Sequence, residues 1–135
     1  MIKLSKEKPY EDACKILGLR PVANYKSYKL TDETRNFIKL ETVAKALNEG
    51  WKPTTIDPKE VRYYVWGWNY TDNRKSSGLL TVHSLNGLGL AAATVGTSLE
   101  FKDRDTAKEF ARMCKPMIVK YLFGRDDHEN FKFDF

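Results

Sequence analysis

Hydrophobic residues recur along this chain with two different periods, and the change of period separates helices from strands. In the first third of the sequence the apolar positions are three or four residues apart, which is typical of amphipathic helices. Proline suits a first helical position, threonine is a good N-cap, and glycine is a common stop. We therefore predict one helix from Pro9 to a stop at Gly18, and a second from Thr31 to about Glu49.

The most aromatic stretch of the chain is VRYYVWGWNY, from Val61 to Tyr70. Aromatic and β-branched residues at this density favour a strand. With a period of two, Val65 and the residues at alternate positions form a face that we expect helices to cover. Because neither face is polar, we predict that this strand lies near the centre of a sheet. The opposite face, called the aromatic face below, consists of Arg62, Tyr64, Trp66 and Trp68.

Two further strands are predicted, from about Gly78 to Ser84 and from Thr97 to Lys102. The polar turn before the first of these predicts an antiparallel hairpin with the aromatic strand. The glycine- and alanine-rich stretch Asn86–Gly96 is predicted to be a loop.

A long apolar stripe predicts the last helix, from the N-cap Asp103 to a stop at Gly124. The apolar stripe continues past Pro116 without a change of phase. We therefore expect this proline to kink the helix on its solvent side and not to end it. The chain is thus predicted to be a single α+β domain over residues 1–124, with two N-terminal helices, a three-stranded antiparallel sheet and a long kinked C-terminal helix. Six residues should be buried together: Leu40, Leu47, Val65, Phe101, Phe110 and Ile118.

Composition places the chain among soluble globular proteins. It has 135 residues, of which 41% are hydrophobic and 30% charged. No apolar run approaches the length needed to cross a bilayer, and the first residues do not resemble a secretory signal. We interpret Cys14 and Cys114 as reduced core thiols of a cytosolic protein. The net charge of +5 is unevenly distributed, because the segment after Gly124 has two basic and four acidic residues. A basic body can bind polyanions, although solubility is the favoured explanation for a modest excess of this size.

No catalytic motif is recognisable, and we expect neither an enzyme nor a cofactor. The only histidines are His83 and His128, no cysteine pair has zinc spacing, and the acidic group around His128 reads as a solvated tail. The glycine-rich stretch lacks the lysine of a phosphate-binding loop and the strand–glycine–helix order of a dinucleotide fold. A nucleophile would need a neighbouring base, and His83 and Ser84 point to opposite faces of a strand.

Four blocks of the sequence occur in an order that resembles a family of small uncharacterised proteins of phages and prophages from gut anaerobes. The most specific is the ALNEGWKP motif followed by a strand with paired tyrosines, whereas Arg104–Tyr121 departs from the pattern. The resemblance implies a phage origin and no catalytic residues. The blocks are Tyr10–Pro21, Glu41–Pro53, Val61–Trp68 and Val95–Ala111.

Two surfaces are candidates for binding. The last helix has a row of basic residues spaced four, four and three apart, called the basic row below, which can follow a phosphate backbone or simply be a solvated flank. The aromatic face has the composition of a surface on which bases stack, and also that of a subunit interface or of a strand covered by a second helix layer. The basic row consists of Arg104, Lys108, Arg112 and Lys115.

The C-terminal tail, residues 125–135, is acidic and then aromatic. Phe131, Phe133 and Phe135 alternate with polar residues, so their rings lie on one side of an extended strand. Such a strand suits addition to an open sheet edge, in the same subunit, in a neighbouring subunit or in another phage protein. The alternative is a tail that folds back over its own core.

Two functions follow from these surfaces. We expect a non-catalytic accessory protein whose favoured partner is nucleic acid. The alternative is a virion or assembly protein that binds itself or another phage protein through apolar surfaces and the tail. Either would be found in the cytoplasm of an infected bacterium or in the virion.

Overall fold

The computed structural model describes residues 2–21, 30–53, 59–71, 76–86 and 97–135. Most of the predicted loop Asn86–Gly96 lies outside these ranges. Among the described residues the fold is a single α+β domain with two N-terminal helices, a four-stranded mixed sheet and a long C-terminal helix. The predicted fold class is therefore confirmed.

The two N-terminal helices begin where their capping residues predict. α1 spans Pro9–Leu17 and ends at Gly18, whose φ of 67° is the left-handed conformation that favours glycine. α2 spans Asp32–Leu47, and the hydroxyl of its N-cap Thr31 accepts a hydrogen bond from the Thr34 amide at 3.1 Å. α2 packs against both α1 and the C-terminal helix.

The aromatic strand is central, as predicted. β1 (Val61–Thr71) pairs with β2 (Ser76–Asn86) along its whole length in an antiparallel hairpin, and on its other side with β3 (Glu100–Phe101). The third strand is shorter than predicted, because residues Thr97–Leu99 form the 3-10 helix η3. Only two residues then remain to pair with β1 before the next helix begins.

The C-terminal helix α3 (Arg104–Phe123) packs on the Val65 side of the sheet, and its N-cap Asp103 accepts a hydrogen bond from the Thr106 amide at 2.7 Å. The predicted kink is present and is centred at Cys114, whose φ and ψ are −114° and 20°. A proline two residues later cannot donate the usual helical hydrogen bond and its ring crowds the preceding turn. Pro116 itself is exposed, so the kink lies on the solvent side.

A fourth strand comes from the C-terminal tail, which the sequence predicted as a strand for an open sheet edge without fixing which edge it joins. β4 (Phe131–Phe133) pairs with β2 in parallel, so that the sheet order is β3-β1-β2-β4. The prediction of a purely antiparallel sheet was therefore wrong at this edge. Parallel neighbours need a long crossover, and α3 lies between β2 and β4 in the chain.

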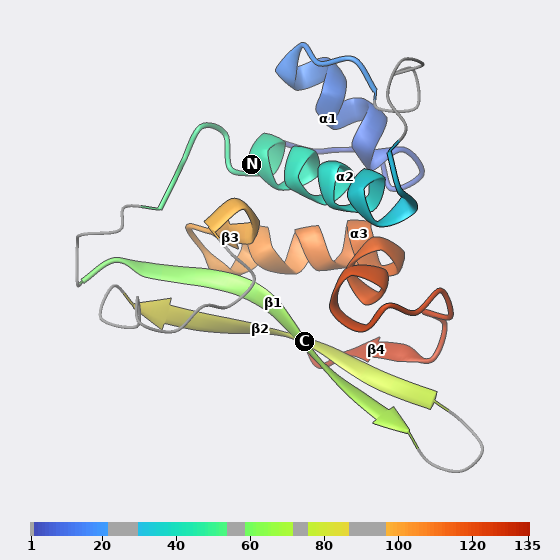
Figure 1. Cartoon of the computed structure of the whole chain (residues 1–135). Helices are drawn as coiled ribbons and strands as arrows, with labels where there is room; N and C mark the ends of the chain where they lie inside the picture. Colours follow the sequence, from blue (N-terminus) through green and yellow to red (C-terminus); the bar gives the residue numbers. More distant parts are fainter. Residues whose placement is uncertain (1, 22–29, 54–58, 72–75, 87–96) are drawn as a thin grey trace.

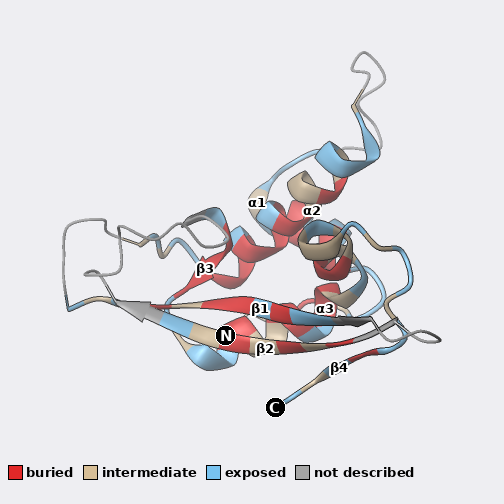
Figure 2. Ribbon diagram, turned by 60° about the horizontal axis from the view of Figure 1, so that its bottom comes forward, coloured by how far each residue is buried: buried red, intermediate tan, exposed pale blue. Residues whose placement is uncertain are grey.

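The elements form layers in which α3 covers the sheet, α2 packs on α3, and α1 packs on α2 (Figure 1). All three helices lie on the same side of the sheet (Figures 1 and 2). The six residues predicted to share the core are all buried. The opposite side of the sheet has no helix over it among the described residues, and it carries the aromatic face.

Candidate binding surfaces

The aromatic face spans both strands of the hairpin. Tyr64, Trp66 and Trp68 of β1 are opposite His83, Thr81 and Leu79 of β2 in the strand register. The Trp66 ring stacks on the His83 ring at a centroid distance of 6.4 Å, and the Tyr64 ring meets His83 edge-on at 5.9 Å. Trp66 is 37% exposed and Trp68 48% exposed, which are high values for such large apolar side chains in a central strand. The result is an open surface of neighbouring aromatic rings.

Arg62 was predicted to belong to this surface, but the structure removes it from solvent. Its side chain is 3% exposed; its Nε lies 3.3 Å from Glu100 Oε2 and its Nη1 donates to Oε1 at 3.5 Å. Burial raises the pKa of the Glu100 carboxyl, and the Arg62 charge only partly opposes this shift. Arg62 thus joins β1 to β3, and Tyr64 is also nearly buried. Trp66, Trp68 and His83 remain as the accessible aromatic group.

The basic row is placed together on one flank of α3, but its charges contact parts of the same chain. Arg104 lies over the Tyr63 ring at 5.2 Å and its Nη1 donates to the Val82 carbonyl oxygen at 2.9 Å. Lys108 and Arg112 lie over the Phe135 ring at 5.7 and 5.1 Å. Lys115 lies over the Phe133 ring at 5.7 Å, completing a row of cation–π contacts with the tail. The basic row therefore contacts two rings of the tail and, through Arg104, the backbone of β2.

The C-terminal tail docks in the same subunit. The Gly78 amide donates to the Asn130 carbonyl oxygen and the Asp134 amide to that of Leu80, both at 3.2 Å. Phe131 is completely buried and stacks on Phe123 at 5.3 Å. Any β-carbon added at Gly78 would be only 2.0 Å from the Phe131 ring, so this glycine makes the space that the ring occupies. In this structure the three tail phenylalanines are internal contacts rather than a free docking segment.

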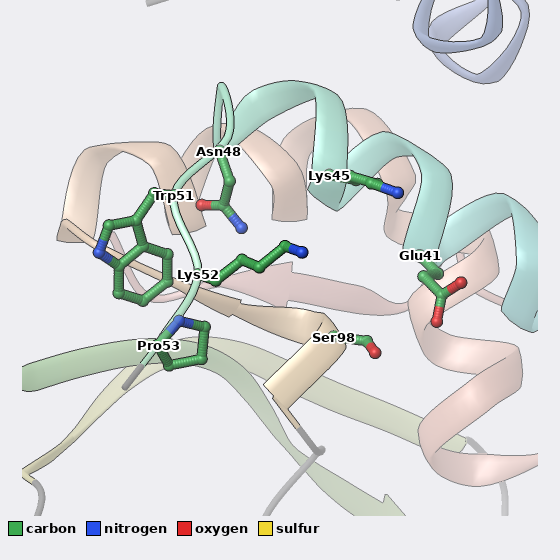
Figure 3. Close-up of a pocket in the computed structure, with 7 residues that line it drawn as sticks. All are labelled: Glu41, Lys45, Asn48, Trp51, Lys52, Pro53 and Ser98. Carbon is green, nitrogen blue, oxygen red and sulfur yellow. The ribbon is translucent and has the colours of Figure 1, made fainter. Parts of the chain in front are cut away.

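A concave site lies elsewhere, at the C-terminal end of α2 (Figure 3). This cleft has a volume of about 390 Å³. Its walls come from α2, from the segment that follows it, and from η3, and none of these residues was predicted to belong to a binding site. The lining residues are Glu41, Lys45, Asn48, Trp51, Lys52, Pro53 and Ser98.

Two of the residues that matter on the open surfaces were also missed. His83 was considered only as a metal ligand or a catalytic base, although its alternation with Thr81 and Leu79 places it on the same side as Trp66 once the hairpin register is known. Lys132 of β4, opposite Leu79 in the register, is an exposed cation on this side of the sheet. The alternation of side chains along each strand is visible in the sequence. Placing His83 and Lys132 beside Trp66 and Trp68 also requires knowing which residues of neighbouring strands pair.

The described residues offer little for catalysis or metal binding. No group of three His, Cys, Asp or Glu side chains that could hold a metal ion occurs within these ranges. Both cysteines are buried in the core, and burial raises the pKa of the Cys114 thiol to about 12, so this thiol stays protonated and is a poor nucleophile.

Comparisons with known proteins supply no relative: no protein-family model, curated protein or solved structure matches this chain. Among the helices of the described ranges, none is long and apolar enough to span a membrane.

Proposed function

We propose that this protein is a non-catalytic, phage-encoded accessory protein that binds single-stranded nucleic acid on the aromatic face of its sheet. One observation carries the proposal: Trp66 and Trp68 are exposed side by side on a sheet face with no described helix over it, and His83 stacks on Trp66. The phage origin rests on the sequence blocks alone.

The geometry suits bases that are separated from one another. Residues two apart in a strand are about 6.6 Å apart, roughly twice the 3.4 Å rise between stacked bases in a duplex strand. An extended single strand therefore can place one base over Trp66 and the next over Trp68, whereas a duplex hides the ring faces of its bases. Stacking on aromatic side chains contributes about 1–3 kcal/mol per base and tolerates any sequence.

The charges near this face predict an unusual salt dependence. Arg62 is buried in its pair with Glu100, and the basic row lies on the helix-covered side, so among the described residues Lys132 is the cation placed to meet a phosphate. For single strands the logarithm of the binding constant falls by about 0.7 per phosphate contact for each logarithm of salt. We expect a slope near −1, well below that of proteins that follow the backbone with many cations.

Titration of labelled single-stranded DNA and RNA at low salt, followed by tryptophan fluorescence and anisotropy, tests this function. Trp66→Ala and Trp68→Ala should each weaken binding by about 1–3 kcal/mol, that is by roughly 5- to 150-fold. Tyr121→Ala is the matched control, because Tyr121 is an exposed ring on α3 that lies outside the aromatic face. A wild-type protein without affinity for DNA or RNA at low salt would dispose of the proposal.

A second candidate, a virion or assembly protein, uses the same surface. Exposed tryptophans with few charges around them are also typical of the core of a subunit interface. In that case light scattering should show an oligomer that resists high salt and dissociates in Trp68→Ala, with or without DNA. The tail is a weaker docking element for this role, because its three phenylalanines already contact their own subunit.

A further inference from the structure

The cleft at the end of α2 has the dimensions of a small-molecule site. Such sites commonly enclose about 300–1,000 Å³, and this one measures about 390 Å³. Unlike the aromatic face it is concave, and Figure 3 shows its side chains arriving from three separate segments. Neither Trp66 nor Trp68 lines it, so it is a separate surface.

A tight turn fixes one wall of the cleft. After α2 the backbone takes two positive φ values in succession, 50° at Glu49 and 89° at Gly50. The first is uncommon for a residue with a side chain and costs conformational energy. The Trp51 amide then donates to the Asn48 carbonyl oxygen at 2.9 Å, which closes the turn. This turn places Trp51 at the C-terminal end of α2, where it lines the cleft.

Asn48 joins the two sides of the cleft. Its side chain is buried, and its Nδ2 donates to the Glu100 carbonyl oxygen at 2.9 Å, which ties α2 to the strand that follows η3. Its Oδ1 finds no donor among the described residues and is turned toward Trp51 in Figure 3. A buried acceptor without a partner costs about 1–3 kcal/mol, so the site retains an unused hydrogen-bonding group.

The cleft has an apolar end and a charged end. The flat ring of Trp51 and Pro53 form one side in Figure 3, while Lys45, Lys52 and Ser98 present polar groups on the other. Neither lysine forms an ion pair with any residue of the described ranges. Among the described residues of the lining, Glu41 is the single carboxylate, so their charged end is cationic on balance.

We propose that this cleft binds a small anion that carries a planar ring, the chemistry shared by nucleoside monophosphates and aromatic carboxylates. The ring stacks on Trp51, which is the side chain best suited to this contact. The phosphate or carboxylate pairs with Lys45 and Lys52, with the Ser98 hydroxyl as a further donor. This activity goes beyond strand binding on the aromatic face and does not require it.

The experiment uses the three tryptophan indole N–H signals in the ¹H–¹⁵N spectrum of the full chain, assigned with single Trp→Phe variants. AMP and indole-3-acetate are titrated separately, with adenosine and inorganic phosphate as half-ligands. We expect the Trp51 signal to shift with AMP or indole-3-acetate, or with both, and at least tenfold more weakly with either half-ligand. Lys45→Ala with Lys52→Ala should weaken binding at least tenfold, whereas the matched control, Lys3→Ala with Lys6→Ala, should not.

Three outcomes overturn the proposal. The first is a Trp51 signal unmoved by both ring-bearing anions up to about 10 mM, beyond the range of a specific site. The second is equal binding by the two double-lysine variants. The third is a shift confined to Trp66 and Trp68, which assigns the nucleotide to the aromatic face and supports the proposed function instead. A shift with only one of the two ring-bearing anions supports the proposal and identifies whether phosphate or carboxylate is preferred.

Discussion

The basic row of α3 and the aromatic face of β1 are both regular patterns in the sequence, but the first contacts its own chain and the second is open to solvent. The cations of the row lie over the rings of Tyr63, Phe133 and Phe135, inside the same subunit. The tryptophans of the aromatic face keep more than a third of their surface exposed. A row that suggested phosphate binding thus contacts its own chain, whereas a face that a second helix layer could have covered is at the surface.

The reason lies in where each pattern sits relative to its neighbours. A basic row beside the apolar stripe of a helix runs along the boundary of the core, where long side chains lay their stems and charges over whatever apolar edge is there. Here that edge is the C-terminal tail. The outer face of a central strand is covered only if a second layer exists, and all three helices pack on the other side.

The largest change in stability should come from breaking the ion pair between Arg62 and Glu100, which buries Arg62 away from the aromatic face. Arg62→Met leaves the Glu100 carboxylate buried without its partner, and should lower the free energy of unfolding by about 3–5 kcal/mol in urea titration. The double variant Arg62→Met with Glu100→Met should recover much of this loss. A single variant as stable as the wild type would mean that Arg62 is free to serve the aromatic face.

The same pair predicts a dependence of stability on pH. Because burial raises the pKa of Glu100, the folded state holds this proton more tightly than the unfolded state does. The contribution of Glu100 to stability is therefore lost as the pH rises from the ordinary carboxyl pKa through the raised value. The stability of the wild type relative to Glu100→Gln should fall across that window. A difference that grows with pH would show that the attraction of Arg62 outweighs burial.

Removing the fully buried ring of the tail should have the next largest effect on the free energy of unfolding. Phe131→Ala empties the space over Gly78 and should cost about 3 kcal/mol of unfolding free energy, toward the low end for a phenylalanine because the site lies at a sheet edge. Phe135→Ala is the matched control and should cost clearly less, since that ring is only half-buried. If Phe131→Ala instead left a stable body and abolished an oligomer, the tail would dock in a neighbouring subunit.

Neutralising the basic row separates its internal role from phosphate binding. The triple variant Arg104→Gln, Lys108→Gln and Arg112→Gln loses three cation–π contacts of roughly 0.5–1 kcal/mol each, so the free energy of unfolding should fall by about 1.5–3 kcal/mol. Affinity for single-stranded DNA should match that of a control with the same net charge, in which the exposed residues Lys3, Lys6 and Lys15 become glutamine. A much larger loss of affinity in the triple variant than in the control would show that the basic row binds nucleic acid.

The smallest effect concerns the cap that begins α3. Asp103→Ala removes the acceptor of the Thr106 amide and should cost about 1 kcal/mol. Burial acts to raise the pKa of Asp103, but the hydrogen bonds from Thr106 outweigh it and the pKa is lowered. The cap therefore contributes fully above the ordinary aspartate pKa, and its contribution is lost as the pH falls through the lowered value. The stability difference between wild type and Asp103→Ala should shrink in acid, while Asp103→Asn should retain part of it.

Local chemistry decided much of this fold before any contact between elements. Thr31, Gly18 and Asp103 mark helix boundaries because capping depends on only a few neighbouring residues. The period of two in Val61–Tyr70 fixed which residues share a face, and the density of apolar residues placed the strand centrally. The kink near Pro116 followed from a missing amide. These are properties that the sequence alone determined.

Only the tertiary structure decided which faces are exposed and which segments meet. The docking of Phe131 on Gly78 joins residues that are distant in the chain, and no local period encodes that pairing. The burial of Arg62 depends on Glu100 from another strand, and the cleft depends on η3 lying beside the end of α2. Such contacts follow from the packing of whole elements, because the free energy that selects them comes from the combined burial of many side chains rather than from any one stretch of sequence.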